Sequence, residues 1–175
     1  MILKILVVLL VVIGAVLAFA ASRPDAFRVQ RTARIKATPD KIAPLVTDFH
    51  RWGAWSPWES LDPTMKRAYS GAPRGVGAVY EWGGNRNVGA GRMEITEASP
   101  ARIVIALDFL RPFAAHNVAT FTLEPSGDAT QVTWAMDGRH VYVAKVMGLF
   151  VNMDRMVGSY FETGLTRLRT ASEAS

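Results

Sequence analysis

The side chains that most often carry out acid–base or metal chemistry are few and scattered in this chain of 175 residues. The histidines, His50, His116 and His140, lie far apart, and none belongs to an H-x-x-x-H or H-E-x-x-H pair. The chain contains no cysteine, so it forms no disulfide and offers no thiolate nucleophile. Zinc sites are built from His, Cys or carboxylate ligands at close, regular spacings. The sequence therefore predicts neither a metal site nor a cofactor.

Nucleophile and phosphate-binding motifs are also missing from the sequence. Neither G-x-S-x-G nor G-x-x-x-x-G-K-[ST] occurs. Charged residues do fall within strand-like runs, at Glu81, Arg92, Glu94, Asp108 and Asp137. In an alternating strand such residues lie on the solvated face by default. A Glu81–Arg92 pair turned inward across a hairpin is the alternative that would supply acid–base chemistry.

An aromatic segment is the most unusual local feature of the chain. Trp52, Trp55 and Trp58 fall three residues apart, and Pro57 among them excludes a long regular helix. The cluster is either a lid over a pocket or a plug at one end of the core, and the large apolar area of each ring favours the plug. Flexible methionines, which also suit pocket walls, occur at Met136, Met147, Met153 and Met156.

The N-terminal segment, residues 5–21, contains only apolar residues and glycine. At about 1.5 Å per helical residue, this run approaches the ~30 Å thickness of a bilayer's hydrocarbon core. Lys4 and the tripeptide Ala18-Phe19-Ala20 also fit a cleaved signal peptide, but the apolar core of a signal peptide is usually only ~7–15 residues long. We therefore expect an uncleaved single-pass anchor. The expected divisions are an anchor at 1–22, a connector at 23–26, a domain at 27–171 and a tail at 172–175.

The net charge of +5 arises beside this apolar segment. The basic side chains there are Lys4, Arg23, Arg28, Arg31, Arg34 and Lys36, and Asp25 offsets one of them. From residue 37 onwards the basic and acidic side chains cancel. A nucleic-acid-binding protein carries its basic patch on the folded domain, so we expect no nucleic-acid partner. A basic stretch beside a hydrophobic segment suits a membrane instead, and the positive-inside rule favours the cytoplasmic side for the domain.

Hydrophobic periodicity indicates the order of the remaining elements. Residues 27–37 alternate apolar and polar side chains, which predicts a strand, and Thr38 and Pro39 then suit the start of a short helix that runs to Phe49. Residues 142–170 carry apolar side chains at steps of three and four, which predicts one long amphipathic helix. Further strands are expected at 76–82, 88–98, 102–109, 118–123 and 131–136, with a hairpin turn at 83–87. Such a meander of antiparallel strands must be covered on its apolar face, so we expect an α+β fold with the long helix as the cover.

Several segments carry a family resemblance. They are RIKATPDKI at 34–42, WSPW at 55–58 with Asp62-Pro63, YSG at 69–71 with GVG at 75–77, TWAMDG at 133–138, and residues 153–165 of the last helix. In this order they resemble the helix-grip fold of the START-like (SRPBCC) superfamily and its polyketide cyclase/dehydrase branch, over about residues 27–169. The resemblance implies a curved antiparallel sheet wrapped around a long C-terminal helix, with an apolar pocket for a hydrophobic ligand between them.

Strand alternation then assigns the side chains that would line such a pocket. Residues two apart share a face, so Trp134 and Met136 turn inward while Asp137 turns outward. The same rule turns Phe109 and Phe121 inward and leaves Asp108 outside. The expected ligand-binding residues are Trp58, Tyr80, Trp82, Phe109, Phe121, Trp134, Met136, Phe150, Met153 and Val157.

Three functions remain open for this domain. The leading hypothesis is a membrane-tethered, non-catalytic module that binds a hydrophobic small molecule or lipid. The alternative is a pocket enzyme of polyketide cyclase or dehydratase type, which requires a positioned acid or base. The third is an interaction domain whose pocket has collapsed. The sequence leaves the oligomeric state open.

The anchor hypothesis gives the first prediction. Full-length protein should remain in the membrane fraction after carbonate extraction, because its apolar run is uninterrupted. A chain that starts near Asp25 should be soluble. N-terminal sequencing is the control, since a mature protein that begins at Ala21 would instead establish signal-peptide cleavage.

Overall fold

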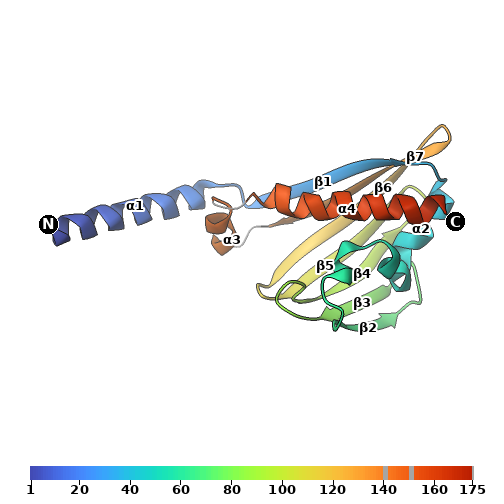
Figure 1. Ribbon diagram of the computed structural model, residues 1–175, viewed down its shortest axis with the longest axis horizontal. Helices are drawn as coiled ribbons and strands as arrows, with labels where there is room; N and C mark the ends of the chain where they lie inside the picture. The colour runs from blue at the N-terminus through green and yellow to red at the C-terminus, as the bar shows by residue number, and fades with distance from the viewer. Residues whose placement is uncertain (140–141, 150–151, 175) are drawn as a thin grey trace.

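The computed structural model describes residues 1–139, 142–149 and 152–174 and shows an α+β fold (Figure 1). The helices are α1 (Ile2–Ser22), α2 (Pro39–Thr47), α3 (Tyr142–Met147) and α4 (Met153–Glu173), with the 3-10 helices η1 (Phe49–Ala54) and η2 (Pro57–Ser60). The strands are β1 (Ala26–Ile35), β2 (Lys66–Gly71), β3 (Ala78–Gly83), β4 (Ala90–Ala98), β5 (Arg102–Arg111), β6 (Ala115–Ser126) and β7 (Ala129–Arg139). They form one seven-stranded antiparallel sheet in the order β1-β7-β6-β5-β4-β3-β2. The expected helix-grip architecture is confirmed.

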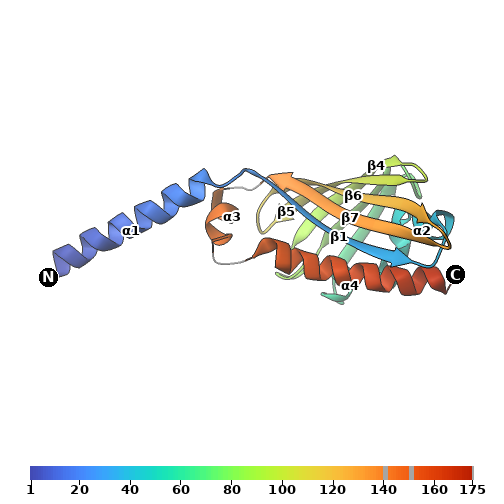
Figure 2. The ribbon, with the colours of Figure 1, turned by 90° about the horizontal axis from the view of Figure 1, so that it is seen from above.

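The core lies on one face of this sheet, as the alternation of the strands requires. In β7, Val132, Trp134 and Met136 are buried, and in β5 Ile103 and Ile105 are fully buried. Figure 2 shows α4 running along this face beside β1, and α2, η1 and η2 cover the remainder. Because side chains alternate with a period of two residues, the intervening positions face away from α4.

The long C-terminal helix is interrupted, so the expectation of one helix over residues 142–170 was wrong. Within the described residues α3 ends at Met147 and α4 begins at Met153. Asn152 caps α4, since its Oδ1 accepts a hydrogen bond of 2.9 Å from the backbone N–H of Arg155. Such a cap satisfies an N–H that lacks an intrahelical partner, and the apolar stripe alone does not reveal it.

Strand β2 was not predicted from periodicity, for a simple physical reason. All of its residues are exposed, so its side chains show no alternation between apolar and polar. It is an edge strand that pairs with β3 alone, from Lys66 opposite Gly83 to Gly71 opposite Ala78.

Helix α1 stands apart from the sheet and is joined to β1 by Arg23, Pro24 and Asp25 (Figure 1). Among the described helices it alone is long and apolar enough to cross a membrane, a property that an anchor and a signal sequence share. Its C-terminal end contacts α3. The hydroxyl of Tyr142 donates to the carbonyl of Leu17 at 2.9 Å, and Nζ of Lys145 donates to the carbonyl of Arg23 at 2.9 Å.

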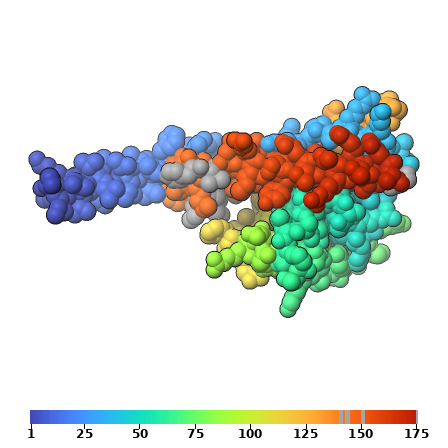
Figure 3. Space-filling model, in the orientation of Figure 1, coloured from blue at the N-terminus to red at the C-terminus, as the bar shows by residue number. Residues whose placement is uncertain are grey.

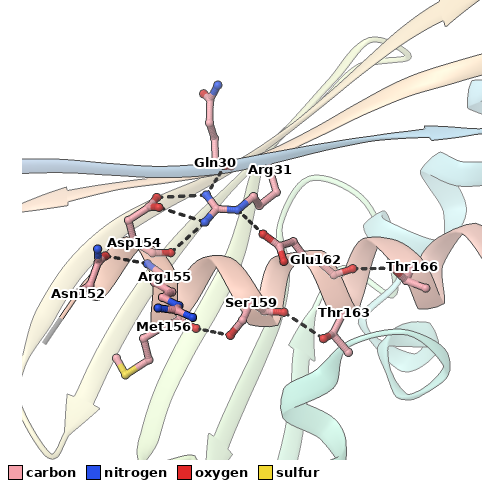
Figure 4. A network of polar contacts seen from close by, with 10 residues as sticks. All are labelled: Gln30, Arg31, Asn152, Asp154, Arg155, Met156, Ser159, Glu162, Thr163 and Thr166. Carbon is pink, nitrogen blue, oxygen red and sulfur yellow. Dashed lines mark hydrogen bonds and ion pairs between the residues drawn. The ribbon is translucent and has the colours of Figure 1, made fainter.

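An arginine from β1 holds the N-terminal half of α4 (Figure 4). Nε of Arg31 donates to Glu162 at 2.7 Å, and its two terminal nitrogens donate to the carboxylate of Asp154 at 3.1 and 3.0 Å. These hydrogen bonds lower the pKa of Asp154 below its usual value. Gly158 lies directly beneath the guanidinium, since a Cβ at this position would sit 2.0 Å from Nη2 of Arg31. We call this set of contacts the Arg31 clamp.

The clamp predicts an unusual effect of adding a methyl group. Gly→Ala inside a helix ordinarily stabilises it by about 1 kcal/mol. In the wild-type background Gly158→Ala should lose most or all of this gain, because the new Cβ displaces the Arg31 guanidinium from Asp154 and Glu162. In an Arg31→Ala background the same substitution should stabilise the protein by about 1 kcal/mol. Chemical denaturation measures both, and equal effects in the two backgrounds would contradict the clamp.

Candidate ligand cavity

A cavity of about 340 Å³ lies between the sheet and the N-terminal half of α4. Its walls come from η1, η2, strands β3 to β7 and α4. Most of the side chains that line it are apolar or aromatic: Trp52, Trp58, Met65, Tyr80, Trp82, Val88, Met93, Leu107, Phe109, Pro112, Ala119, Trp134, Met136, Met156, Val157, Tyr160 and Phe161. Its volume falls within the range of small-molecule sites, which are mostly apolar and few in polar groups.

The packing of α4 explains why this space is open. The C-terminal half of the helix buries Leu165 and Leu168 against the core. The ring of Phe161 stacks on that of Trp134, with centroids 4.2 Å apart and planes 6° apart. In the first two turns before Phe161, Gly158 is the only buried residue, and it lies against the guanidinium of Arg31 rather than on the cavity. The cavity therefore begins where the helix stops packing on the sheet.

Most of the expected site residues lie around this one cavity. Seven of the ten line it: Trp58, Tyr80, Trp82, Phe109, Trp134, Met136 and Val157. Phe121 does not line it, since its ring is fully buried behind Trp134, with centroids 4.9 Å apart. Met153 is half-buried on the first turn of α4 and is also outside the lining. Phe150 lies outside the described residues.

The aromatic segment contributes both a plug and a wall. Trp55 is fully buried and donates its indole N–H to the carbonyl of Leu45 at 2.8 Å. Trp52 is buried too and donates to the carbonyl of Val46 at 3.0 Å. Trp58 is half-buried and lines the cavity, where its ring stacks on Tyr160 with centroids 5.3 Å apart. Trp55 thus packs inside the core against Phe121 and Trp134, while Trp58 joins η2 to α4 at the cavity.

Glu59 is a cavity residue that the sequence reasoning missed. Its side chain is only 11% exposed, and the carboxylate accepts from the hydroxyl of Tyr80 at 2.6 Å and from Nε of Arg67 at 2.7 Å. Burial and then the Glu59 carboxylate raise the pKa of Tyr80, so the phenol keeps its proton and remains the donor. In the sequence Glu59 resembles any loop glutamate. Its adjacency to Trp58 was the only available signal.

The mouth of the cavity is formed by exposed residues of different elements. Arg86 and Asn87 come from the β3–β4 hairpin, Arg111 ends β5 and Pro112 follows it, and Met156 comes from α4. Figure 3 shows the hollow between the first turns of α4 and these two connections. Within the described ranges, neither Arg86 nor Arg111 forms an ion pair.

The other charged candidates lie away from the cavity. Glu81 is exposed, and Arg92, opposite it in the sheet, pairs with Glu94 on its own strand at 2.7 Å. The inward Glu81–Arg92 pair is therefore wrong, and the solvated default is confirmed. His116 contacts Asp108 at 2.7 Å and is also exposed. In the part of the chain that the structure describes, no three His, Asp or Glu side chains are grouped so as to hold a metal ion.

A family model described as polyketide cyclase/dehydrase and lipid transport matches residues 26–173 of the chain. The chain belongs to this family. The match includes every strand, α2 and α4, so it contains the whole cavity. This match also confirms the resemblance to the SRPBCC superfamily. None of the curated proteins compared with the chain matches it.

Solved structures share the fold at low sequence identity. Protein CV1439 from Chromobacterium violaceum aligns with a TM-score of 0.59 and 15% identity over 86% of this chain and 99% of its own. Mll3558 from Rhizobium loti aligns with a TM-score of 0.56 and 21% identity over 83% and 96%. DynU16, from the dynemicin biosynthetic locus, aligns with a TM-score of 0.57 and 19% identity over 86% of this chain and 48% of its own. At sequence identities this low, the similarity shows a shared fold and carries no information about the ligand.

Two phenylalanines provide a test of where the packed core ends. Phe121→Ala should lower the free energy of unfolding by about 3–5 kcal/mol, because the ring is fully buried in the close-packed core. Phe109→Ala should cost less, because one side of its ring already borders the cavity. Denaturation of both variants measures the difference. Binding of an apolar fluorescent probe should change for Phe109→Ala, and equal stability losses would contradict an open cavity.

Proposed function

We propose that this family member is a membrane-tethered domain that binds a hydrophobic small molecule or lipid between its sheet and α4. The observation that supports it is the apolar cavity of about 340 Å³ beside an otherwise close-packed core. An empty apolar cavity of this size is costly, because the side chains around it lose their contact partners. A bound apolar molecule restores those contacts.

The walls of the cavity restrict the chemistry of the ligand. Aromatic rings of Trp58, Trp82 and Trp134 offer large flat apolar surfaces. Glu59 offers a carboxylate with remaining lone pairs, since among the described residues two side chains donate to its oxygens, Tyr80 and Arg67. The best match is a mainly apolar molecule with one hydrogen-bond donor, such as a hydroxyl or an amine.

The apolar helix α1 supports the tether. Its composition and length fit a single span, and the basic residues that follow it suit anionic headgroups. A tether keeps the domain where hydrophobic ligands are concentrated, so that binding does not depend on their low solubility in water.

A pocket enzyme is the second candidate, and Glu59 is the observation in its favour. A carboxylate in an apolar cavity is a candidate general base. Its two partners weigh against that role, because Tyr80 and Arg67 already donate hydrogen bonds to both of its carboxylate oxygens. Mass analysis of the extracted ligand before and after incubation with the protein separates the two. A carrier returns the ligand unchanged, whereas an enzyme returns a product that Glu59→Gln fails to form.

Filling the cavity should abolish binding without unfolding the domain. Val157 lines the cavity from α4 and is half-buried, so Val157→Trp places a large ring in the open space. Native mass spectrometry of the full-length protein in mild detergent should show a bound apolar molecule for the wild type and none for this variant.

Met153→Trp is the matched control, because Met153 lies one turn earlier on the same helix and does not line the cavity. It should retain the ligand. Loss of the ligand in both variants, or a wild-type protein that never carries one, would contradict the proposed function.

A further inference from the structure

One end of the sheet faces α1, and the strand register identifies which segments meet there. Ala26, the first residue of β1, lies opposite Arg139 at the end of β7. The register of the other strands places the β5–β6 connection and the β3–β4 hairpin at the same end of the sheet. Figures 1 and 2 both show these connections, α3 and the start of α4 at the end nearest α1. The β3–β4 hairpin, the end of β5 and the start of α4 also supply the exposed residues of the cavity mouth.

Exposed apolar side chains gather at this end. Leu110, near the end of β5, is 61% exposed, and Phe113, in the β5–β6 connection, is 55% exposed. Tyr142 and Met147 on α3 are about half exposed as well. Single exposed apolar residues are ordinary, but a group of them at the end of the sheet where an apolar cavity opens indicates an interaction surface. We call Leu110, Phe113, Tyr142 and Met147, together with Arg86 and Arg111, the portal face.

The charges of the portal face point to an anionic partner. Arg86 and Arg111 line the cavity mouth and are exposed, and no described carboxylate forms an ion pair with either. Basic side chains interleaved with exposed apolar ones are typical of surfaces that lie in a membrane interface. Each arginine close to an anionic leaflet strengthens binding by about fivefold, and an apolar side chain beside it inserts among the headgroups.

The connection to α1 limits how far this face can lie from a bilayer. Only Arg23, Pro24 and Asp25 separate α1 from β1, and four fully extended Cα–Cα steps span at most about 14 Å. The helix end is also held to α3 through Tyr142 and Lys145. If α1 crosses a membrane, the portal face lies at the surface of that membrane.

We infer that the portal face docks on the anionic surface of the bilayer that α1 spans, so that the cavity opens toward the lipid. This inference rests on the proposed tether. It gives the mouth a definite role, because an amphiphile passes between bilayer and cavity without crossing water. The arginines at the rim then lie at the depth of the lipid phosphates, and the aromatic walls lie beyond them.

Single labelled cysteines test this arrangement directly, because the natural chain has no cysteine. Full-length Leu110→Cys and Phe113→Cys, each carrying an environment-sensitive fluorophore, are placed in nanodiscs that contain a headgroup-proximal quencher and anionic lipid. Val76→Cys is the control, since Val76 is 58% exposed in the β2–β3 connection at the opposite end of the sheet. The first two labels should shift to shorter wavelength and be quenched, and the control label should do neither.

The charge contribution is tested in the same nanodiscs. Each of Arg86→Gln and Arg111→Gln should lower the ratio of docked to undocked protein by about fivefold. Replacing the anionic lipid with a zwitterionic one should remove the contribution of both arginines. Labels at Leu110 and Phe113 that remain as water-exposed as the label at Val76, in protein that co-fractionates with the nanodiscs, would overturn the docking and leave the ligand cavity untouched. Protein that fails to enter nanodiscs at all would overturn the tether and the docking together.

Discussion

The structure depends on how far α4 packs against the sheet. Along the C-terminal half, Phe161 stacks on Trp134, and Gly164 allows close approach, since a Cβ there would lie 2.7 Å from the Trp134 ring. Along the N-terminal half, the helix is held instead by Arg31 from β1. Polar contacts at the edge of the sheet fix the position of the helix without filling the space beneath it. The cavity is the consequence of this change from apolar packing to a polar clamp.

Sequence patterns predicted those parts of the molecule in which burial is periodic. Strand alternation correctly turned Trp134, Met136 and Phe109 toward α4, because one face of a sheet is buried and residues alternate between faces. The same rule could not separate Phe121, in the close-packed core, from Phe109, beside the cavity. That distinction depends on where α4 leaves the sheet, which is a long-range property.

Polar features of the site were harder to predict than apolar ones. Glu59 belongs to a short 3-10 helix without periodicity, and its partners Arg67 and Tyr80 lie on β2 and β3. Arg86 and Arg111 meet at the mouth only because strand register brings the hairpin and the end of β5 together. The apolar lining explains how a hydrophobic ligand is held. Of these scattered polar groups, the two arginines give the opening a basic rim at the end of the sheet nearest α1.

An electron-density map of the full-length protein, crystallised after gentle extraction from its own membranes, tests the central claim most directly. The account predicts continuous density of an apolar molecule between Trp58, Trp134 and Val157, with any polar end near Glu59 or near the arginines of the mouth. A cavity closed by the first turns of α4 packing directly on the sheet, or one that holds only ordered water, would contradict it.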